Sequence, residues 1–269
     1  MMKAKNKSIV VKVLFVTLLV ILLAIEVTHA VLKYNDDVYL LMSRIAGGGA
    51  CLLFIIEFSF TRVLSPLGNK KPLLWLFTLP GFLIAINNFP FVSYIAGDCK
   101  IDAKPSSIAF FALVCLGVGF FEEMAFRGCA FMIFLKSRTQ SRGKIFLAIL
   151  LSSVVFGIVH FVNIFFGASL GAVLLQIGYS ALIGALCSVV LLLTRNIWAC
   201  VCLHAVYNFC GGIIEGYGSG TQWTRHEILF TAALAVIVAA YFCVLFFKMP
   251  TKLASDIFEN GENPLNNEK

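Results

Sequence analysis

Residues 117–128 read Gly-Val-Gly-Phe-Phe-Glu-Glu-Met-Ala-Phe-Arg-Gly, and they place three ionisable side chains inside a long apolar run. A charged residue at the centre of a membrane helix costs roughly 2.5–3.5 kcal/mol on insertion scales, so each one needs a partner or a role. Glu123 and Arg127 are four residues apart, share a helix face and can pair. Glu122 is rotated from Glu123 by about 100° around the helix, and Phe126 stands four residues after it. A buried carboxyl without a charged partner is a candidate general acid or base.

The composition of the chain indicates a membrane protein. Of its 269 residues 60% are hydrophobic and 13% are charged, and the mean hydropathy is +0.93. Soluble domains carry about 25% charged residues, so this chain could not cover a water-exposed surface. We attribute the net charge of +7 to basic cytoplasmic loops and expect no nucleic-acid partner. The nine cysteines lie mostly in apolar runs without a CxxC pair, which favours small buried hydrophobes over a disulfide framework.

Eight apolar runs are long enough to span a bilayer, which takes about 20 residues. They are residues 10–32, 38–60, 73–96, 106–135, 145–166, 170–193, 197–214 and 228–247, and Pro80 and Pro90 interrupt the third of them. We therefore expect an all-α integral membrane protein of about eight transmembrane helices. Residues 1–254 are expected to form one membrane domain, and the polar residues 255–269 a disordered tail. Glu26, Arg44 and Glu57 lie in the first two runs, and we expect structural roles for them.

The positive charges of the loops alternate between the two sides of these runs. With a cytoplasmic N-terminus, the inner loops hold Lys3, Lys5, Lys7, Arg62, Lys70, Lys71, Lys136, Arg138, Arg142, Lys144, Arg195, Lys248 and Lys252. The outer loops hold only Lys33, Lys100, Lys104 and Arg225. Because cytoplasmic loops collect Lys and Arg, both termini are predicted to be cytoplasmic.

Two further runs carry isolated polar side chains. His160 follows Phe156 by one helical turn, and His204 is followed one turn later by Asn208. Imidazole and carboxamide groups that converge can stabilise a developing oxyanion. The alternative for each is a structural hydrogen bond between membrane helices. Three separate apolar runs each carry one group of polar side chains. We therefore expect these groups to face a shared pocket.

Taken together and in order, these motifs resemble a known family. Glu122-Glu123-x-x-x-Arg127, Phe156-x-x-x-His160 and His204-x-x-x-Asn208 are similar to the three motifs of the CAAX protease and bacteriocin-processing family, also called CPBP or Abi. The resemblance covers about residues 108–212. It implies an intramembrane endopeptidase with a CAAX-protease-like helical core and a cavity between its helices.

The resemblance also implies roles for the matching residues. Glu122 would be the general base that activates water, and His160 would polarise that water or move its proton. His204 and Asn208 would line an oxyanion hole, with Glu123 and Arg127 as structural support. We expect no metal cofactor, because Asn is an unusual zinc ligand. The alternative is a zinc ion held by Glu122, His160 and His204.

The expected partners are membrane lipid and a hydrophobic or membrane-associated peptide substrate. Two other functions remain open: a non-enzymatic scaffold or bacteriocin-immunity protein that keeps the motifs for helix packing, and a proton-coupled transporter, since Glu and His chains also form proton relays. The sequence shows no internal repeat of the kind common in transporters, which argues against the transporter hypothesis. The compact chain carries no retention signal, which favours a bacterial plasma membrane over the endoplasmic reticulum.

Overall fold

The computed structural model describes residues 37–139 and 141–258, together with residues 9–10, 13–14, 16–18, 20–21, 24–25 and 27–28. The helices are α2 Asp37–Glu57, α3 Pro72–Leu76, α4 Leu79–Ile86, α5 Phe91–Ala96, α6 Pro105–Glu123, α7 Met132–Leu135, α8 Arg142–Val159, α9 Leu170–Thr194, α10 Ile197–Tyr217, α11 Arg225–Lys248 and α12 Lys252–Ser255. A π-helical segment, Met124–Phe131, joins α6 to α7, and 3₁₀ turns cover Thr61–Leu64 and His160–Ile164. Two short strands, β1 Cys99–Ile101 and β2 Gly218–Gly220, pair antiparallel.

Six helical stretches of the described chain are long and apolar enough to cross a membrane. They are Asp37–Glu57, Pro105–Leu135, Arg142–Ile164, Leu170–Thr194, Ile197–Tyr217 and Arg225–Lys248. Each coincides with one of the eight predicted runs, and the chain is a largely helical integral membrane protein. The first predicted run, residues 10–32, lies largely outside the described residues, as does Glu26.

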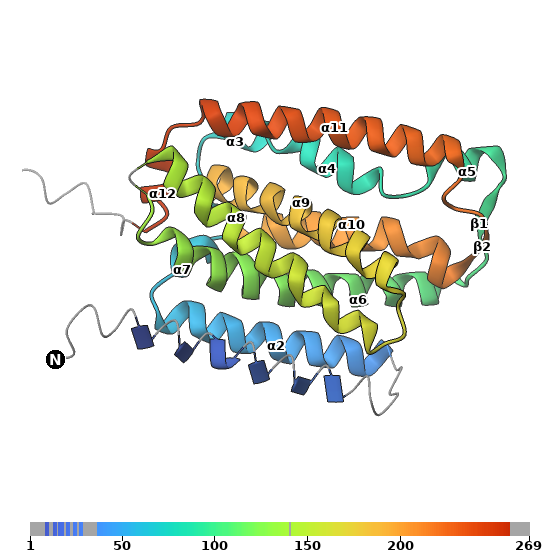
Figure 1. Cartoon of the computed structure of the whole chain (residues 1–269), viewed down its shortest axis with the longest axis horizontal. Coiled ribbons are helices and arrows are strands. Elements are labelled where there is room, and N and C mark those ends of the chain that lie inside the picture. Colours follow the sequence, from blue (N-terminus) through green and yellow to red (C-terminus); the bar gives the residue numbers. More distant parts are fainter. Residues whose placement is uncertain are drawn as a thin grey trace, which may run out of the picture.

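The third predicted run, residues 73–96, is not one continuous helix. It is divided into α3, α4 and α5, with Pro80 in the first turn of α4 and Pro90 immediately before α5. Proline lacks a backbone N–H and disfavours a helical conformation in the residue before it, so it begins helices and interrupts them. The predicted span therefore becomes a broken apolar segment beside α11 (Figure 1).

Close helix packing positions the elements that carry the motifs. α6 packs against α10 and α2, and α8 packs against α9. A Cβ atom at Gly119 of α6 would lie 2.9 Å from the carbonyl oxygen of Val201 in α10. A Cβ atom at Gly157 of α8 would lie 2.7 Å from the carbonyl oxygen of Ile177 in α9. These glycines allow the backbones to approach, as small residues do between membrane helices.

Successive long helices run in opposite directions, so the loops alternate between two ends of the bundle (Figure 1). The end with α7 and α12 gathers most of the basic loop residues of the described chain. They are Arg62, Lys70, Lys71, Lys136, Arg138, Arg142, Lys144, Arg195, Lys248 and Lys252. The end with β1 and β2 holds Lys100, Lys104 and Arg225. The fold therefore has the charge asymmetry that the sequence predicts, and the cytoplasmic location of the basic end stays a prediction.

Residues 255–258, at the start of the predicted tail, lie against the bundle. Ile257 is buried, and the ring of Phe258 packs edge-on against Phe60 with 6.1 Å between the ring centroids. Residues 259–269, the rest of the predicted tail, lie outside the described residues.

Candidate active site

The two adjacent glutamates lie where the helix geometry changes. Glu122 and Glu123 are the last residues of α6, and the π-helical segment begins at Met124. Short π-helical stretches occur mostly inside α-helices and frequently at functional sites. The sequence indicated a continuous α-helix here, and no residue pattern revealed the wider turn.

Glu123 and Arg127 form the buried pair that their spacing predicts. Arg127 Nη1 lies 3.2 Å from Glu123 Oε1, and the two side chains are 1% and 0% exposed. The guanidinium also lies over the ring of Phe156, 4.5 Å from its centroid. Among the described residues, no hydrogen-bond partner completes the Arg127 nitrogens or Glu123 Oε2. The cost of burying these two charges is therefore offset mainly by their mutual attraction and by the contact of the guanidinium with the Phe156 ring. Aligned hydrogen bonds contribute less.

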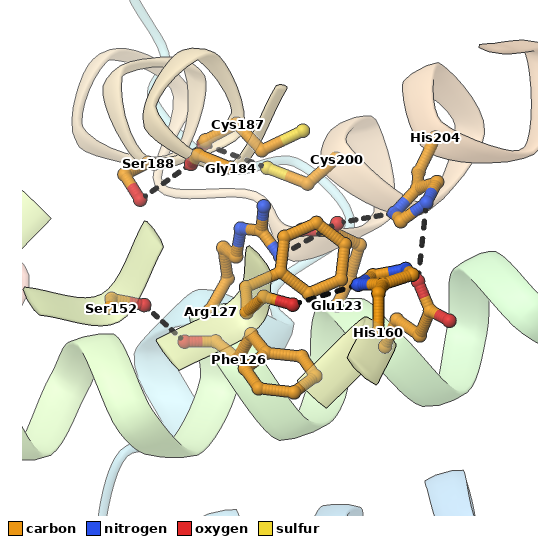
Figure 2. A network of polar contacts seen from close by, with 12 residues as sticks. Glu123, Phe126, Arg127, Ser152, His160, Gly184, Cys187, Ser188, Cys200 and His204 are labelled. Atoms are coloured by element: carbon orange, nitrogen blue, oxygen red, sulfur yellow. Dashed lines mark hydrogen bonds and ion pairs between the residues drawn. The ribbon is translucent and has the colours of Figure 1, made fainter. Parts of the chain in front are cut away.

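His204 connects the two glutamates across the helix interface. Its Nδ1 lies 2.7 Å from Glu123 Oε1, and its Nε2 lies 3.3 Å from Glu122 Oε2. Figure 2 shows Arg127, Glu123 and His204 converging from two segments of the bundle. The sequence paired Glu123 with Arg127 alone and gave His204 no acidic partner. In the structure Glu123 Oε1 lies near both Arg127 and His204, and each ring nitrogen of His204 has a carboxylate neighbour.

His160 is held in a defined tautomer by its own helix. It lies at the end of α8, where the backbone tightens into a 3₁₀ turn, and its Nδ1 is 2.9 Å from the carbonyl oxygen of Phe156. A carbonyl oxygen only accepts hydrogen bonds, so Nδ1 carries the proton and donates it. In the neutral ring, Nε2 is then an unprotonated acceptor. The Phe156 ring packs edge-on against both His160 and His204.

A large cavity brings the predicted catalytic side chains together. Its volume is about 1710 Å³, and its lining includes Glu122, His160, His204 and Asn208. Glu123 is fully buried behind this lining. The other lining side chains are mostly apolar. The three spans that carry the motifs therefore contribute to one space, as their shared polarity indicated.

The cavity also includes polar residues that the sequence interpretation missed. Arg44, expected to be structural, lines it from α2, with its guanidinium 5.1 Å from the ring centroid of Phe121. Asn163 and Gln176 line it too, and the Asn163 amide donates a 2.7 Å hydrogen bond to Gln176 Oε1. Their polarity inside apolar runs was the only available signal, because none of them belongs to a motif.

The alternative zinc site is not formed by the described residues. No group of three or more His, Cys, Asp or Glu side chains among them is arranged to hold a metal ion. His204 Nδ1 faces Glu123, which is not one of the three predicted ligands, and Nε2 lies 3.3 Å from Glu122, but His160 does not join these two residues in a group that could hold a metal ion. His160 offers only Nε2, since Nδ1 faces the Phe156 carbonyl. The donor set as arranged does not fit the tetrahedral site that zinc prefers.

Comparison with known families agrees with the motifs. Residues 104–210 match the family model described as Rce1-like, type II CAAX prenyl endopeptidase Rce1-like. The matched segment contains all three motifs and all four cavity-lining candidates, Glu122, His160, His204 and Asn208. The resemblance to CAAX proteases is thereby confirmed over this segment. No curated protein and no solved structure matches the chain.

Proposed function

We propose that the Rce1-like segment forms the catalytic centre of an intramembrane endopeptidase with Glu122 as its general base. The observation that carries the proposal is the position of the Glu122 carboxylate, 3.3 Å from His204 Nε2 at a cavity that His160 and Asn208 also line. The mostly apolar lining suits a hydrophobic or membrane-associated peptide. The size of the cavity, about 1710 Å³, exceeds that of a typical small-ligand pocket of about 300–1,000 Å³.

The proposed reaction begins with a water molecule between Glu122 and His160. Glu122 takes one proton from the water, and His160 Nε2 accepts a hydrogen bond from the other. The resulting hydroxide attacks the carbonyl carbon of the scissile peptide bond, and the carbonyl oxygen becomes an oxyanion. Glu122 then returns its proton to the leaving amine nitrogen as the C–N bond breaks, so the carboxylate is regenerated.

His204 and Asn208 are proposed to stabilise the oxyanion. Asn208 has no hydrogen-bond partner among the described residues, so its amide N–H groups are available to a substrate. His204 Nε2 faces Glu122 in the resting site. It would turn its hydrogen bond from Glu122 to the oxyanion once Glu122 binds the water proton. Glu123 and Arg127 act as positioning residues, because Glu123 contacts His204, Arg127 pairs with Glu123, and neither lines the cavity.

The experiment compares Glu122→Gln with the wild-type chain reconstituted in liposomes. Cleavage of a panel of membrane-anchored and hydrophobic peptides is followed by mass spectrometry. We expect Glu122→Gln to abolish cleavage, because the amide has no basic oxygen of comparable strength. Glu57→Gln is the matched control, since Glu57 is an exposed glutamate outside the cavity lining. Retained cleavage by Glu122→Gln at wild-type protein levels would sink the proposal.

The metal-free form of the proposal is tested separately. Prolonged incubation with a strong chelator, followed by metal analysis, should leave cleavage unchanged. Loss of cleavage that only a divalent transition metal restores would replace the glutamate mechanism with a metal-dependent one.

We further propose that the protein lies in a bacterial plasma membrane, with the basic end of the bundle in the cytoplasm. Protease accessibility of tagged loops, compared between intact cells and inverted vesicles, would test this orientation.

A further inference from the structure

A second, smaller pocket lies at the basic end of the bundle, and none of its lining residues belongs to the motifs. Its volume is about 380 Å³, and the loop between α2 and α3 and the turn between α9 and α10 form its walls. Four of its lining residues are cationic: Arg62, Lys70, Lys71 and Arg195. No carboxylate is among the lining residues, and none of the four forms an ion pair with any residue that the structure describes. Four like charges that converge without an acid repel one another, so this pocket favours an anion.

Hydrogen bonds fix the two walls to each other before any ligand binds. The Asn69 amide donates to the carbonyl oxygen of Leu193 at 3.2 Å, and the Asn196 amide donates to that of Pro66 at 2.8 Å. Gly68 takes a left-handed φ of 52°, and a Cβ atom there would lie 2.3 Å from the carbonyl oxygen of Thr194. The cations are therefore presented by a loop that is anchored to the membrane helices.

The backbone conformation and the unpaired Nε of Arg195 are the strongest indication that the pocket binds a ligand. It ends α9 in the left-handed conformation, with φ 51°, which glycine adopts without steric cost and other residues rarely adopt. Its Nε is buried and has no hydrogen-bond partner among the described residues. The backbone at this position favours glycine, yet the chain places there an arginine that leaves a buried donor unused. An anion in the pocket would supply the missing acceptor.

The surroundings of the pocket place it at a membrane interface. The indole N–H of Trp75 donates to the carbonyl oxygen of Asn69, and that of Trp198 donates to the carbonyl oxygen of Leu64. Tryptophan is enriched at the level of the lipid headgroups. Leu67, in the same loop, is 74% exposed. Basic pockets on the cytoplasmic side of membrane helices meet the anionic lipids of that leaflet.

We propose that this pocket binds the phosphate group of an anionic phospholipid. Arg62 and Arg195 would hold the phosphate oxygens from the side of the helices, since guanidinium groups match phosphate geometry. Lys70 and Lys71, which are exposed, would meet the outer oxygens and the headgroup. The acyl chains would lie along the apolar surface beside Trp198 and Leu67.

The test measures lipid binding to the purified full chain in neutral detergent by native mass spectrometry. The first arm titrates phosphatidylglycerol, the second phosphatidylcholine, and the third inorganic phosphate. The variants are Arg195→Gly and the double variant Lys70→Gln/Lys71→Gln. Lys144→Gln is the matched control, an exposed lysine at the same end of the bundle but outside the pocket.

We expect phosphatidylglycerol to bind the wild type more tightly than phosphatidylcholine. Loss of each pocket cation should weaken that binding about fivefold, the effect of one basic residue near an anionic surface. Arg195→Gly should melt no lower than the wild type, because glycine suits the left-handed backbone, so its loss of binding cannot be ascribed to unfolding.

Three results would overturn the proposal. Equal binding of the two lipids would remove the need for an anionic headgroup. Equal weakening by Lys144→Gln would show that the general charge of this end, and not the pocket, attracts the lipid. Binding of inorganic phosphate as tight as that of phosphatidylglycerol would assign the pocket to a soluble phosphate.

Discussion

One oxygen of Glu123, Oε1, lies 2.7 Å from Nδ1 of His204 and 3.2 Å from Nη1 of Arg127. The carboxylate therefore contacts side chains from two segments of the bundle: it pairs with the charge of Arg127, and it fixes the orientation of the His204 imidazole. An imidazole that donates from Nδ1 to Glu123 has its Nε2 directed toward Glu122 and the cavity. This link makes Glu123 a positioning residue for the proposed chemistry as well as a structural one.

The first prediction separates these two roles of Glu123. Glu123→Gln leaves Arg127 buried without an anion and should lower the free energy of unfolding by about 3–5 kcal/mol, the usual cost of breaking a buried ion pair. The double variant Glu123→Gln/Arg127→Met removes both charges and should recover most of that loss, as neutralised pairs commonly do. Reversible unfolding in detergent with increasing sodium dodecyl sulfate measures the difference.

Cleavage by the double variant should stay low even where stability returns, because His204 has lost the carboxylate that orients its ring through Nδ1. A purely structural Glu123 predicts the opposite result, in which cleavage recovers together with stability. The comparison needs equal amounts of folded protein, which the unfolding measurement supplies.

The second prediction concerns His160. Because Nδ1 is occupied by the Phe156 carbonyl, only Nε2 can accept a hydrogen bond from water. His160→Ala should lower kcat by about a hundred- to ten-thousand-fold, the typical contribution of a general acid or base, with little change in KM. His226→Ala is the control, since His226 is exposed at the start of α11 and does not line the cavity. A rise in KM at constant kcat would instead assign His160 to substrate binding.

The sequence predicted those parts of the site that depend on spacing along one helix. The Glu123–Arg127 pair follows from a separation of four residues, and the structure confirms it. The link between His204 and Glu123 joins residues 81 positions apart, and no periodicity encodes how far one helix slides along another. The same limit applies to Arg44, whose place at the cavity depends on the packing of α2 against α6.

Two further differences between the predicted and the observed structure arise from local breaks in the regular helical backbone. Pro80 and Pro90 were visible in the third run, but hydropathy counts them as ordinary members of an apolar stretch. Their missing N–H groups divide it into α3, α4 and α5. The π-helical segment after Glu123 has no composition signal, because it differs from an α-helix only in its hydrogen-bond register.

The third prediction tests the contact between α6 and α10. A Cβ atom at Gly119 would lie 2.9 Å from the Val201 carbonyl oxygen and 3.2 Å from the Ala205 nitrogen, and backbone atoms cannot rotate away. Gly119→Ala should therefore destabilise the chain by about 1–3 kcal/mol, the usual cost of overpacking. It should also reduce cleavage, because Glu122 and His204 lie on the two helices that are pushed apart.

Gly49→Ala is the matched control, since a Cβ atom at Gly49 in α2 has no neighbour within 4 Å among the residues that the structure describes. It should be neutral or stabilise the chain by about 0.5–1 kcal/mol, because alanine favours a helix over glycine. Thermal unfolding and cleavage rates of the two variants check both expectations. Equal stability of the two variants would contradict the close approach at Gly119.

The fourth prediction concerns Asn208 and decides between oxyanion stabilisation and helix packing. Asn208 lines the cavity on α10, one turn after His204, and no described residue offers it a hydrogen bond. A side chain without a protein partner contributes little to holding helices together, so Asn208→Ala should leave the melting temperature within a degree or two, about the effect of a few tenths of a kcal/mol. The substitution should instead weaken stabilisation of the transition state. Removal of one oxyanion donor typically lowers kcat by about a hundred- to a thousand-fold.

Asn208→Asp sharpens this test, because it keeps the size of the side chain and replaces N–H donors by an anionic oxygen. Repulsion of the developing oxyanion should make this variant less active than Asn208→Ala, with KM nearly unchanged in both. If Asn208 served helix packing, the two variants would lower the melting temperature and retain kcat in the folded fraction. Rates measured at saturating peptide on equal amounts of folded protein distinguish the two outcomes.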